Sequence, residues 1–172
     1  MGMVISPDVL RTQLAYSAWA SQRLVGAASR LTSDELKRDF ETADRHVLGT
    51  LVHVYAADRI WLARVTGAPS PAFTTDADYH FPVLQNDWPA LHQRWQQWAA
   101  SLTGEQTDST IAYKDTKGNP YTSVLWQIVL HVVNHGSHHR GQVSGFLRAM
   151  GHTPPPLDLM AYYRQLAASA AR

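Results

Sequence analysis

The stretch from Thr122 to Met150 decides the fold, and it reads TSVLWQIVLHVVNHGSHHRGQVSGFLRAM. Its apolar residues recur three and four positions apart, which is the spacing of one face of an α-helix. Gly151 follows the last of these residues, and prolines occupy 154–156, an arrangement typical of a helix end. At 1.5 Å per residue, the predicted helix is roughly 40 Å long.

Three further long helices are predicted from the same spacing and from their end signals. The first begins at Ser6-Pro7, a capping serine followed by the residue favoured at the first helical position. The second runs from about residue 44 to Thr66 and ends before Gly67. The third begins at Asp87, a favourable capping residue. This third helix carries an apolar seam expected to face a partner helix: Trp88, Leu91, Trp95, Trp98 and Leu102.

The segments between these helices lack a regular helical pattern. Residues 67–86 form a proline-containing connection, and 104–121 are polar and rich in turn residues. Within the latter, Ile111–Tyr113 is predicted to be briefly extended and Lys117–Pro120 to form a turn. A short helical tail is predicted from about Asp158. With four long helices and no convincing sheet, residues 1–172 are predicted to form one domain, an all-α, up-down four-helix bundle.

The composition indicates a globular protein and excludes several kinds of site. Apolar residues make up 45 % and charged residues 17 % of the 172 positions. The chain has no cysteine, which excludes disulfides and thiolate ligands. Its 15 basic and 14 acidic residues are scattered, so no concentrated basic face for nucleic acid is expected. Without a signal-like N-terminus or a membrane-length apolar run, the sequence predicts a cytoplasmic protein that interacts with neither membranes nor nucleic acid.

Histidines are concentrated in the predicted last long helix. Four of the nine fall within nine consecutive residues: His131, His135, His138 and His139. Residues four apart lie on one helical face, so His135 and His139 can reach the same ion. Buried imidazoles without partners are costly, which favours a metal site over an exposed polar face. The cluster therefore predicts two ligands of one divalent metal ion.

A stable site needs at least a third ligand from another element. His53 is the natural donor, because it lies mid-helix and the second and fourth helices can face each other in a bundle. Periodicity alone leaves other trios open. His131 with His135 would have the same spacing, and His46 lies two turns before His53 on its helix.

The histidine motif contains no acid that could serve as a general base. A thermolysin-like site carries glutamate beside its first histidine, whereas Asn134 and Gly136 flank His135 here. Asp58 follows His53 by five residues and would point about 140° away from it. Peptidase chemistry of that kind is therefore disfavoured.

Three glycines interrupt the same predicted helix at a cost of roughly 1 kcal/mol each relative to alanine. Gly136, Gly141 and Gly145, with neighbouring serines, would create a thin side that another backbone can approach. Together with the tryptophan seam, this side offers more packing surface than one bundle core needs. The prediction is a homodimer.

The run from His131 to Gln142, HVVNHGSHHRGQ, resembles the signature of the DinB family of metal-dependent bundle proteins. The resemblance implies a four-helix bundle, frequently dimeric, whose metal ligands would be His53, His135 and His139. His138 would then lie beside the site or be exposed. Further matching residues cover nearly the whole chain: Leu51–His53, Asp58, Trp61, Tyr16, Trp19, Gly151 and residues 154–158.

Three neutral ligands leave coordination positions open, the pattern of a catalytic site, and suit zinc, nickel, manganese or ferrous iron. Relatives in the resembled family include bacillithiol S-transferases and mycothiol-dependent maleylpyruvate isomerases. The resemblance thus implies a metal-dependent transferase that activates a low-molecular-weight thiol for a small-molecule substrate, or a hydrolase that activates water. Arg140 would bind an anionic group of the thiol cofactor or form a salt bridge on the helix surface. The alternative is a non-catalytic metal-binding or stress-response interaction protein.

Overall fold

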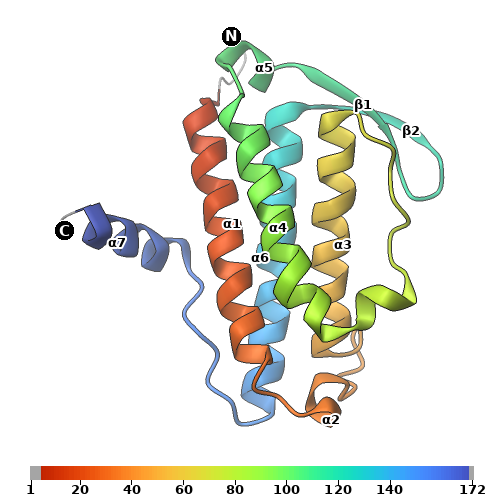
Figure 1. The fold of residues 1–172 in the computed structure, drawn as a ribbon, viewed down its shortest axis with the longest axis vertical. Coiled ribbons are helices and arrows are strands. Elements are labelled where there is room, and N and C mark those ends of the chain that lie inside the picture. The colour runs from red at the N-terminus through yellow and green to blue at the C-terminus, as the bar shows by residue number, and fades with distance from the viewer. Residues whose placement is uncertain (1–4, 171–172) are drawn as a thin grey trace.

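Four long helices form a bundle in the computed structural model, which describes residues 5–170 (Figure 1). They are α1 (Pro7–Ala28), α3 (Val47–Thr66), α4 (Phe81–Ala100) and α6 (Leu125–Ala149). The shorter elements are α2 (Ser33–Leu36), η1 (Asp76–Tyr79), α5 (Gly104–Thr107), β1 (Thr110–Lys114), β2 (Pro120–Val124) and α7 (Leu159–Ala170). Among these residues, none of the helices is both long and apolar enough to cross a lipid bilayer.

The predicted all-α four-helix class is confirmed. Successive helices do not all alternate in direction, however, as they would in an up-down bundle. Helices α1 and α6 run one way, and α3 and α4 both run the other way (Figure 1). The connection between Thr66 and Phe81 causes this, because it returns along α3 before α4 begins. Helices α3 and α6 consequently lie antiparallel: His53 meets His135, and Trp61, two turns later, meets His131.

The prediction that the third helix begins at Asp87 is wrong. Helix α4 begins at Phe81, with Pro82 in its first turn, and Pro89 lies inside it. Pro89 makes Asp87 resemble a helix start, because a proline is favoured in the first turn, whereas inside a helix it removes a backbone hydrogen bond and is normally costly. The segment predicted to be an irregular connection therefore contains η1 and the first turn of α4.

The structure contains a small two-stranded sheet, whereas the sequence predicted no sheet. Strands β1 and β2 pair antiparallel, with Ile111 opposite Ser123 and Tyr113 opposite Tyr121. The predicted extended segment and turn are confirmed, and Gly118 takes the positive φ of +89° that the turn requires. Residues 122–124 belong to β2, so α6 begins at Leu125 and is three residues shorter at its start than predicted.

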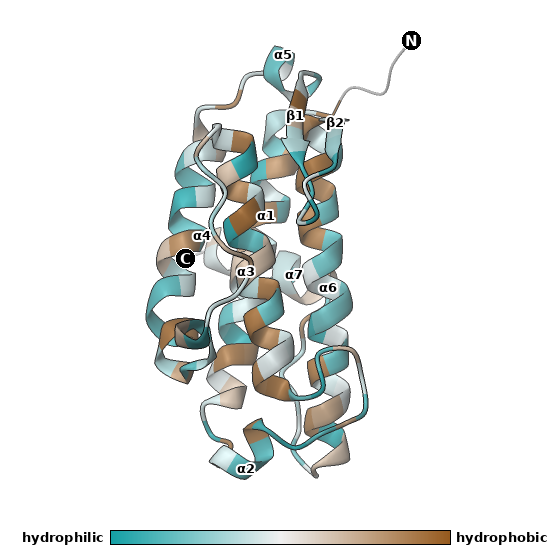
Figure 2. Ribbon diagram, turned by 90° about the vertical axis from the view of Figure 1, so that its right-hand side faces the viewer, coloured by the Kyte–Doolittle hydropathy of each residue, from teal (hydrophilic) through white to brown (hydrophobic). Residues whose placement is uncertain are grey.

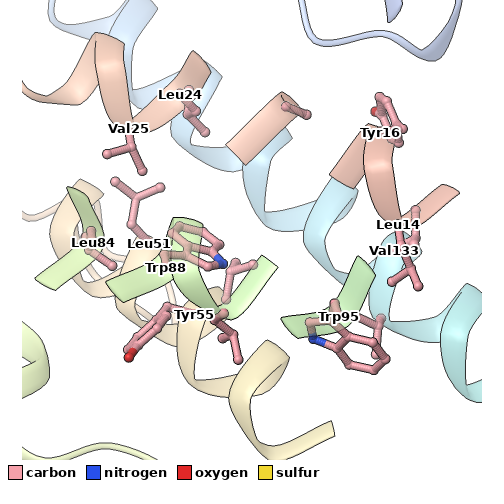
Figure 3. Packing of buried hydrophobic residues seen from close by; sticks show 14 of the residues in the cluster. Leu14, Tyr16, Leu24, Val25, Leu51, Tyr55, Leu84, Trp88, Trp95 and Val133 are labelled. Carbon is pink, nitrogen blue, oxygen red and sulfur yellow. The ribbon is translucent and has the colours of Figure 1, made fainter. Parts of the chain in front are cut away.

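The core is built from the inward faces of the four long helices. Figure 2 shows hydrophobic and hydrophilic residues sharing each long helix, as expected for amphipathic helices. Trp88 and Trp95 are almost fully buried between helices (Figure 3). Their indole N–H groups donate to Asp58, at 2.8 Å to its carboxylate and 3.1 Å to its carbonyl oxygen. The tryptophan seam is thus used inside the chain, which removes one of the two reasons for predicting a dimer.

Candidate metal centre

Three histidines converge where α3 packs against α6. His53 comes from the middle of α3, and His135 and His139 come from successive turns of α6. Each ring offers a nitrogen, and the three nitrogens all lie within 4.8 Å of one another. Nε2 of His53 and Nε2 of His135 are 3.0 Å apart, and the ring of His139 lies 4.5 Å from each of the other two, centroid to centroid.

These distances fit a first-row divalent ion. Metal–imidazole bonds are about 2.0–2.1 Å long, so two nitrogens on one ion stand about 3.0–3.4 Å apart at the usual bond angles. The two Nε2 atoms already have this separation. The cluster of His53, His135 and His139 could therefore hold a metal ion with little movement of the helices.

Oxygen atoms face the outer nitrogens of two of these rings. The two carboxylate oxygens of Asp44 lie 3.4 Å from Nδ1 of His53 and 3.5 Å from Nδ1 of His139. Nδ1 of His139 also lies 2.7 Å from Oε1 of Gln142. Because carboxylate and amide oxygens accept hydrogen bonds, they favour the proton on Nδ1 and leave Nε2 as the ligand atom.

Asp44 was missed by sequence reasoning, since it lies in an irregular loop before α3 and follows no periodicity. Gly49 explains how this loop approaches the helix: a Cβ at position 49 would collide with the carbonyl oxygen of Asp44. His46, in the same loop, caps α3 by accepting a hydrogen bond at 2.8 Å from the Gly49 amide to Nδ1. The sequence signal for this arrangement is weak: His46 stands three residues before Gly49, whose amide it caps.

The structure also separates the alternative ligands from the trio. His46 is used as the cap of α3, as described above. The ring of His131 packs edge-on to Trp61, with 5.3 Å between centroids, and is 5.8 Å from that of His135. His138 is exposed, as the family resemblance implied. Among the residues described, His53, His135 and His139 therefore form the group whose ligand atoms are close enough together to hold one ion.

Burial keeps the ligand rings in the uncharged form that a metal requires. Burial lowers the pKa of His135 to about 4, and the neighbouring rings of His139 and His53 act in the same direction. Burial also lowers the pKa of His139 below its usual value, against the opposing hydrogen bond with Gln142. At neutral pH these two rings hold no extra proton that an ion would have to displace.

Asp58 is buried and lies outside the histidine trio, as predicted. Arg140 lies neither on the surface nor in a surface salt bridge, because only 2 % of it is exposed. Its Nη1 donates to the hydroxyls of Ser17 and Ser21 on α1, at 3.1 Å each, and Nη2 to that of Ser137. These bonds commit Arg140 to joining α6 to α1, so we do not propose it as a cofactor ligand.

Comparisons with known proteins identify the family and the fold of this chain. The model of the DinB family matches residues 6–168. Protein DinB of Bacillus subtilis is 22 % identical in an alignment of 156 positions that covers 86 % of this chain and 89 % of that protein. A crystal structure of a DinB-like protein from Bacillus cereus shares the fold, with a TM-score of 0.67 and 18 % identity over 90 % of this chain and 99 % of that one. The chain belongs to the DinB family.

Proposed function

We propose that this protein binds one divalent metal ion through His53, His135 and His139 and is a metal-dependent enzyme. The observation that carries the proposal is the convergence of three imidazole nitrogens within 4.8 Å of one another. Zinc, nickel, manganese and ferrous iron all accept such ligands. When bound, the ion would leave open coordination positions and lower the pKa of a water or thiol held there.

The surrounding residues orient the three imidazole rings and keep His135 uncharged, as metal binding requires. Asp44 and Gln142 fix the orientation of the rings through their outer nitrogens, and such outer contacts raise the basicity of the ligand nitrogen. Burial keeps His135 unprotonated well below neutral pH. The side chain of His53 is 27 % exposed, which leaves the site open to a small molecule from solvent.

The chemistry of the site favours transfer of a low-molecular-weight thiol over hydrolysis. Within residues 5–170, no carboxylate joins the three histidines as a possible ligand, and that of Asp44 faces their outer nitrogens and so is not placed as a base for a molecule on the ion. Hydrolysis of a stable bond usually needs such a base to take a proton from water. A thiol has an ordinary pKa of about 8.5 and ionises without one when its pKa is lowered. The thiol's proton would pass to solvent, and the thiolate would form a carbon–sulfur bond to an electrophilic carbon of the substrate, whose leaving group departs with the electron pair of the broken bond.

The metal site is tested by elemental analysis of protein purified without an affinity tag. Alanine substitution of any ligand, as in His53→Ala, His135→Ala or His139→Ala, is expected to abolish stoichiometric metal binding. His138→Ala is the matched control, because its ring is exposed beside the cluster, and it should retain the metal. Metal retained by His53→Ala would place the third ligand elsewhere.

The thiol activity is tested separately with cobalt-loaded protein. A thiolate ligand adds a charge-transfer band in the near ultraviolet, and we expect at least one of several low-molecular-weight thiols to produce it at neutral pH. The same thiol should form product with an electrophile faster than in the absence of protein. Bound cobalt with neither the band nor the product would favour the non-catalytic metal-binding alternative.

A further inference from the structure

A hollow of about 460 Å³ lies between α3, the connection that follows it and the β1–β2 hairpin. Ile60 and Arg64 of α3 form one wall, residues 70–73 of the connection form a second, and residues 114–116 of the hairpin form the third. Figure 1 shows these three segments on the same side of the bundle. Two of the three walls of the hollow are therefore formed by segments that lie outside the four long helices.

We propose that this hollow binds an anionic group of the enzyme's substrate, a carboxylate or a phosphate, through the guanidinium of Arg64. The proposal deepens the function proposed above and rests on it for the identity of the molecule as a substrate. It assigns the hollow a chemical class of ligand, namely an extended small molecule with a negative charge at one end. The surroundings of Arg64, the charge of the hollow and the position of the hollow relative to His53 support this assignment.

The guanidinium of Arg64 is held rigidly but is not neutralised. It lies against the rings of Trp61 and Tyr113, with its central carbon 4.4 and 4.9 Å from their centroids. Nη2 donates to the carbonyl oxygen of Lys114 at 2.7 Å, and Nε is buried without a hydrogen-bond partner. Among the ion pairs of the described residues, none includes Arg64, so no carboxylate oxygen lies within 4.0 Å of its nitrogens.

Another arginine of the same helix differs from Arg64, because it is paired with a carboxylate. Arg59, which is also part-buried on α3, forms two hydrogen bonds of 2.8 and 3.0 Å to the carboxylate of Asp78. That ion pair raises the pKa of Arg59, whereas burial lowers the pKa of Arg64. A part-buried cation with donors to spare is costly unless an anion pairs with it. Arg64 is thus the member of the pair that is available to a ligand.

The hollow as a whole carries an excess of positive charge. Lys114 lines it together with Arg64. Asp115 also lines it, but its carboxylate already accepts hydrogen bonds from the backbone of Lys117 and from the backbone and side chain of Asn119. The hydrogen bonds of Asn119 and Lys117 lower the pKa of Asp115, so its carboxylate stays charged and offsets one of the two cations. One net positive charge remains in the hollow to attract an anion.

The position of the hollow gives the length of the ligand. Phe73 lines the hollow and lies edge-on to the ring of His53, with 5.4 Å between centroids. Arg64 follows His53 by eleven residues, which is about 16 Å along a helix, and helical side chains lean back towards the N-terminus. A molecule on the order of 10 Å long could therefore reach from the guanidinium to the histidines, with its middle against Ile60 and Phe73.

Binding is tested by nuclear magnetic resonance on protein labelled with ¹⁵N-arginine, in metal-loaded and chelator-treated forms. The Nε–H resonance of Arg64, assigned by its loss in Arg64→Gln, should shift on titration with inorganic phosphate and with S-methylglutathione. S-methylglutathione has no free thiol, and its dimethyl ester lacks the carboxylates, so the ester should cause no comparable shift. Because the chelator-treated form is included, the anion site can be established even if the metal-dependent activity fails.

The variants make the test specific. Arg64→Gln should weaken binding of S-methylglutathione about tenfold or more, the usual effect of losing a charge-assisted hydrogen bond, and should leave binding of the ester unchanged. Lys117→Gln is the matched control, because it removes an exposed positive charge from the same hairpin without lining the hollow. Absence of any shift with both anions, or equal losses for Arg64→Gln and Lys117→Gln, would overturn the proposal.

The anionic group could belong to the thiol or to the electrophile, and kinetics distinguish these sources. In the metal-loaded enzyme, KM is compared for glutathione and its diethyl ester, and for 4-(chloromethyl)benzoate and its methyl ester. The preference for the acid over the ester should disappear in Arg64→Gln for the substrate that carries the anion. If the preference is unaffected for both substrates, Arg64 does not bind a substrate anion, even where phosphate binds.

Discussion

Gly136 lies directly against the guanidinium of Arg140, one turn further along α6. A Cβ at position 136 would stand 2.7 Å from Nη1 of Arg140, the same nitrogen that binds Ser17 and Ser21. The glycine next to the ligand His135 thus makes room for a buried cation of its own helix. It does not create the thin side for a neighbouring backbone that the sequence predicted, whereas Gly141 and Gly145 have open space at their Cβ positions.

This contact predicts opposite effects for glycines in one helix. Gly136→Ala gains about 1 kcal/mol in helix propensity but displaces a guanidinium whose hydrogen bonds are buried. We expect a net loss of about 1–3 kcal/mol in the free energy of unfolding, measured by urea denaturation. Gly141→Ala and Gly145→Ala should instead gain up to about 1 kcal/mol. An increase in stability for Gly136→Ala would show that Arg140 moves aside without loss.

Asp44 is predicted to strengthen metal binding without touching the ion. Asp44→Asn removes the charge facing Nδ1 of His53 and His139, and loss of such an outer contact typically costs about 10–100-fold in affinity. Competition with a chelator of known affinity measures the change. Asp39→Asn, in the same loop but paired with Arg45, should have little effect. Equal effects of the two variants would mean that general loop charge matters and the contact does not.

The low pKa of His135 predicts how stability depends on pH in the metal-free protein. An unfolded histidine titrates near 6.5, whereas burial lowers the pKa of His135 to about 4. Between these values the unfolded chain binds more protons than the folded one, so the free energy of unfolding falls as the pH falls from about 6.5 to 4. Urea denaturation of chelator-treated protein measures this slope. His135→Gln should have a shallower slope, and an unchanged slope would count against burial as the cause.

Asp58 is predicted to be a structural residue of the core. Its carboxylate accepts the hydrogen bond from Trp88 and lies 3.4 Å from Nε2 of His92, in an environment that is almost fully buried. Asp58→Ala leaves the indole N–H unpaired, and we expect a loss of about 3–5 kcal/mol in the free energy of unfolding. In a double-mutant cycle, Trp88→Phe should cost less in the Asp58→Ala background than alone. Additive losses would show that the two side chains do not interact.

The homodimer remains a prediction that rests on the open side of α6 at Gly141 and Gly145 and on the family resemblance. The tryptophan seam no longer supports it, because Trp88 and Trp95 are buried within one chain. Light scattering at micromolar concentration is expected to give the mass of two chains, about twice 19.2 kDa. A monomeric mass at that concentration would remove the prediction.

The sequence by itself determined the helical class and placed together two of the three histidines of the candidate metal site. Helical periodicity is a local property, so the spacing of apolar residues placed the long helices, and the four-residue spacing placed His135 and His139 on one face. Local signals also misled at the ends of elements. Asp87 and Pro89 resemble the start of a helix, and residues 122–124 resemble part of one. The tertiary contacts that offset a proline or pair a strand leave no periodic trace in the sequence.

Only the tertiary structure decided which residues complete the site. Periodicity allowed His46 or His131 as ligands, and the antiparallel packing of α3 on α6 brought His53 to the pair while His46 became a helix cap. Asp44 lies in an irregular loop and contacts His139, and Arg64 of α3 donates to the hairpin residue Lys114. Both contacts join residues that are far apart in the chain. Such long-range contacts follow from how faces pack in three dimensions, which no local pattern in one sequence encodes.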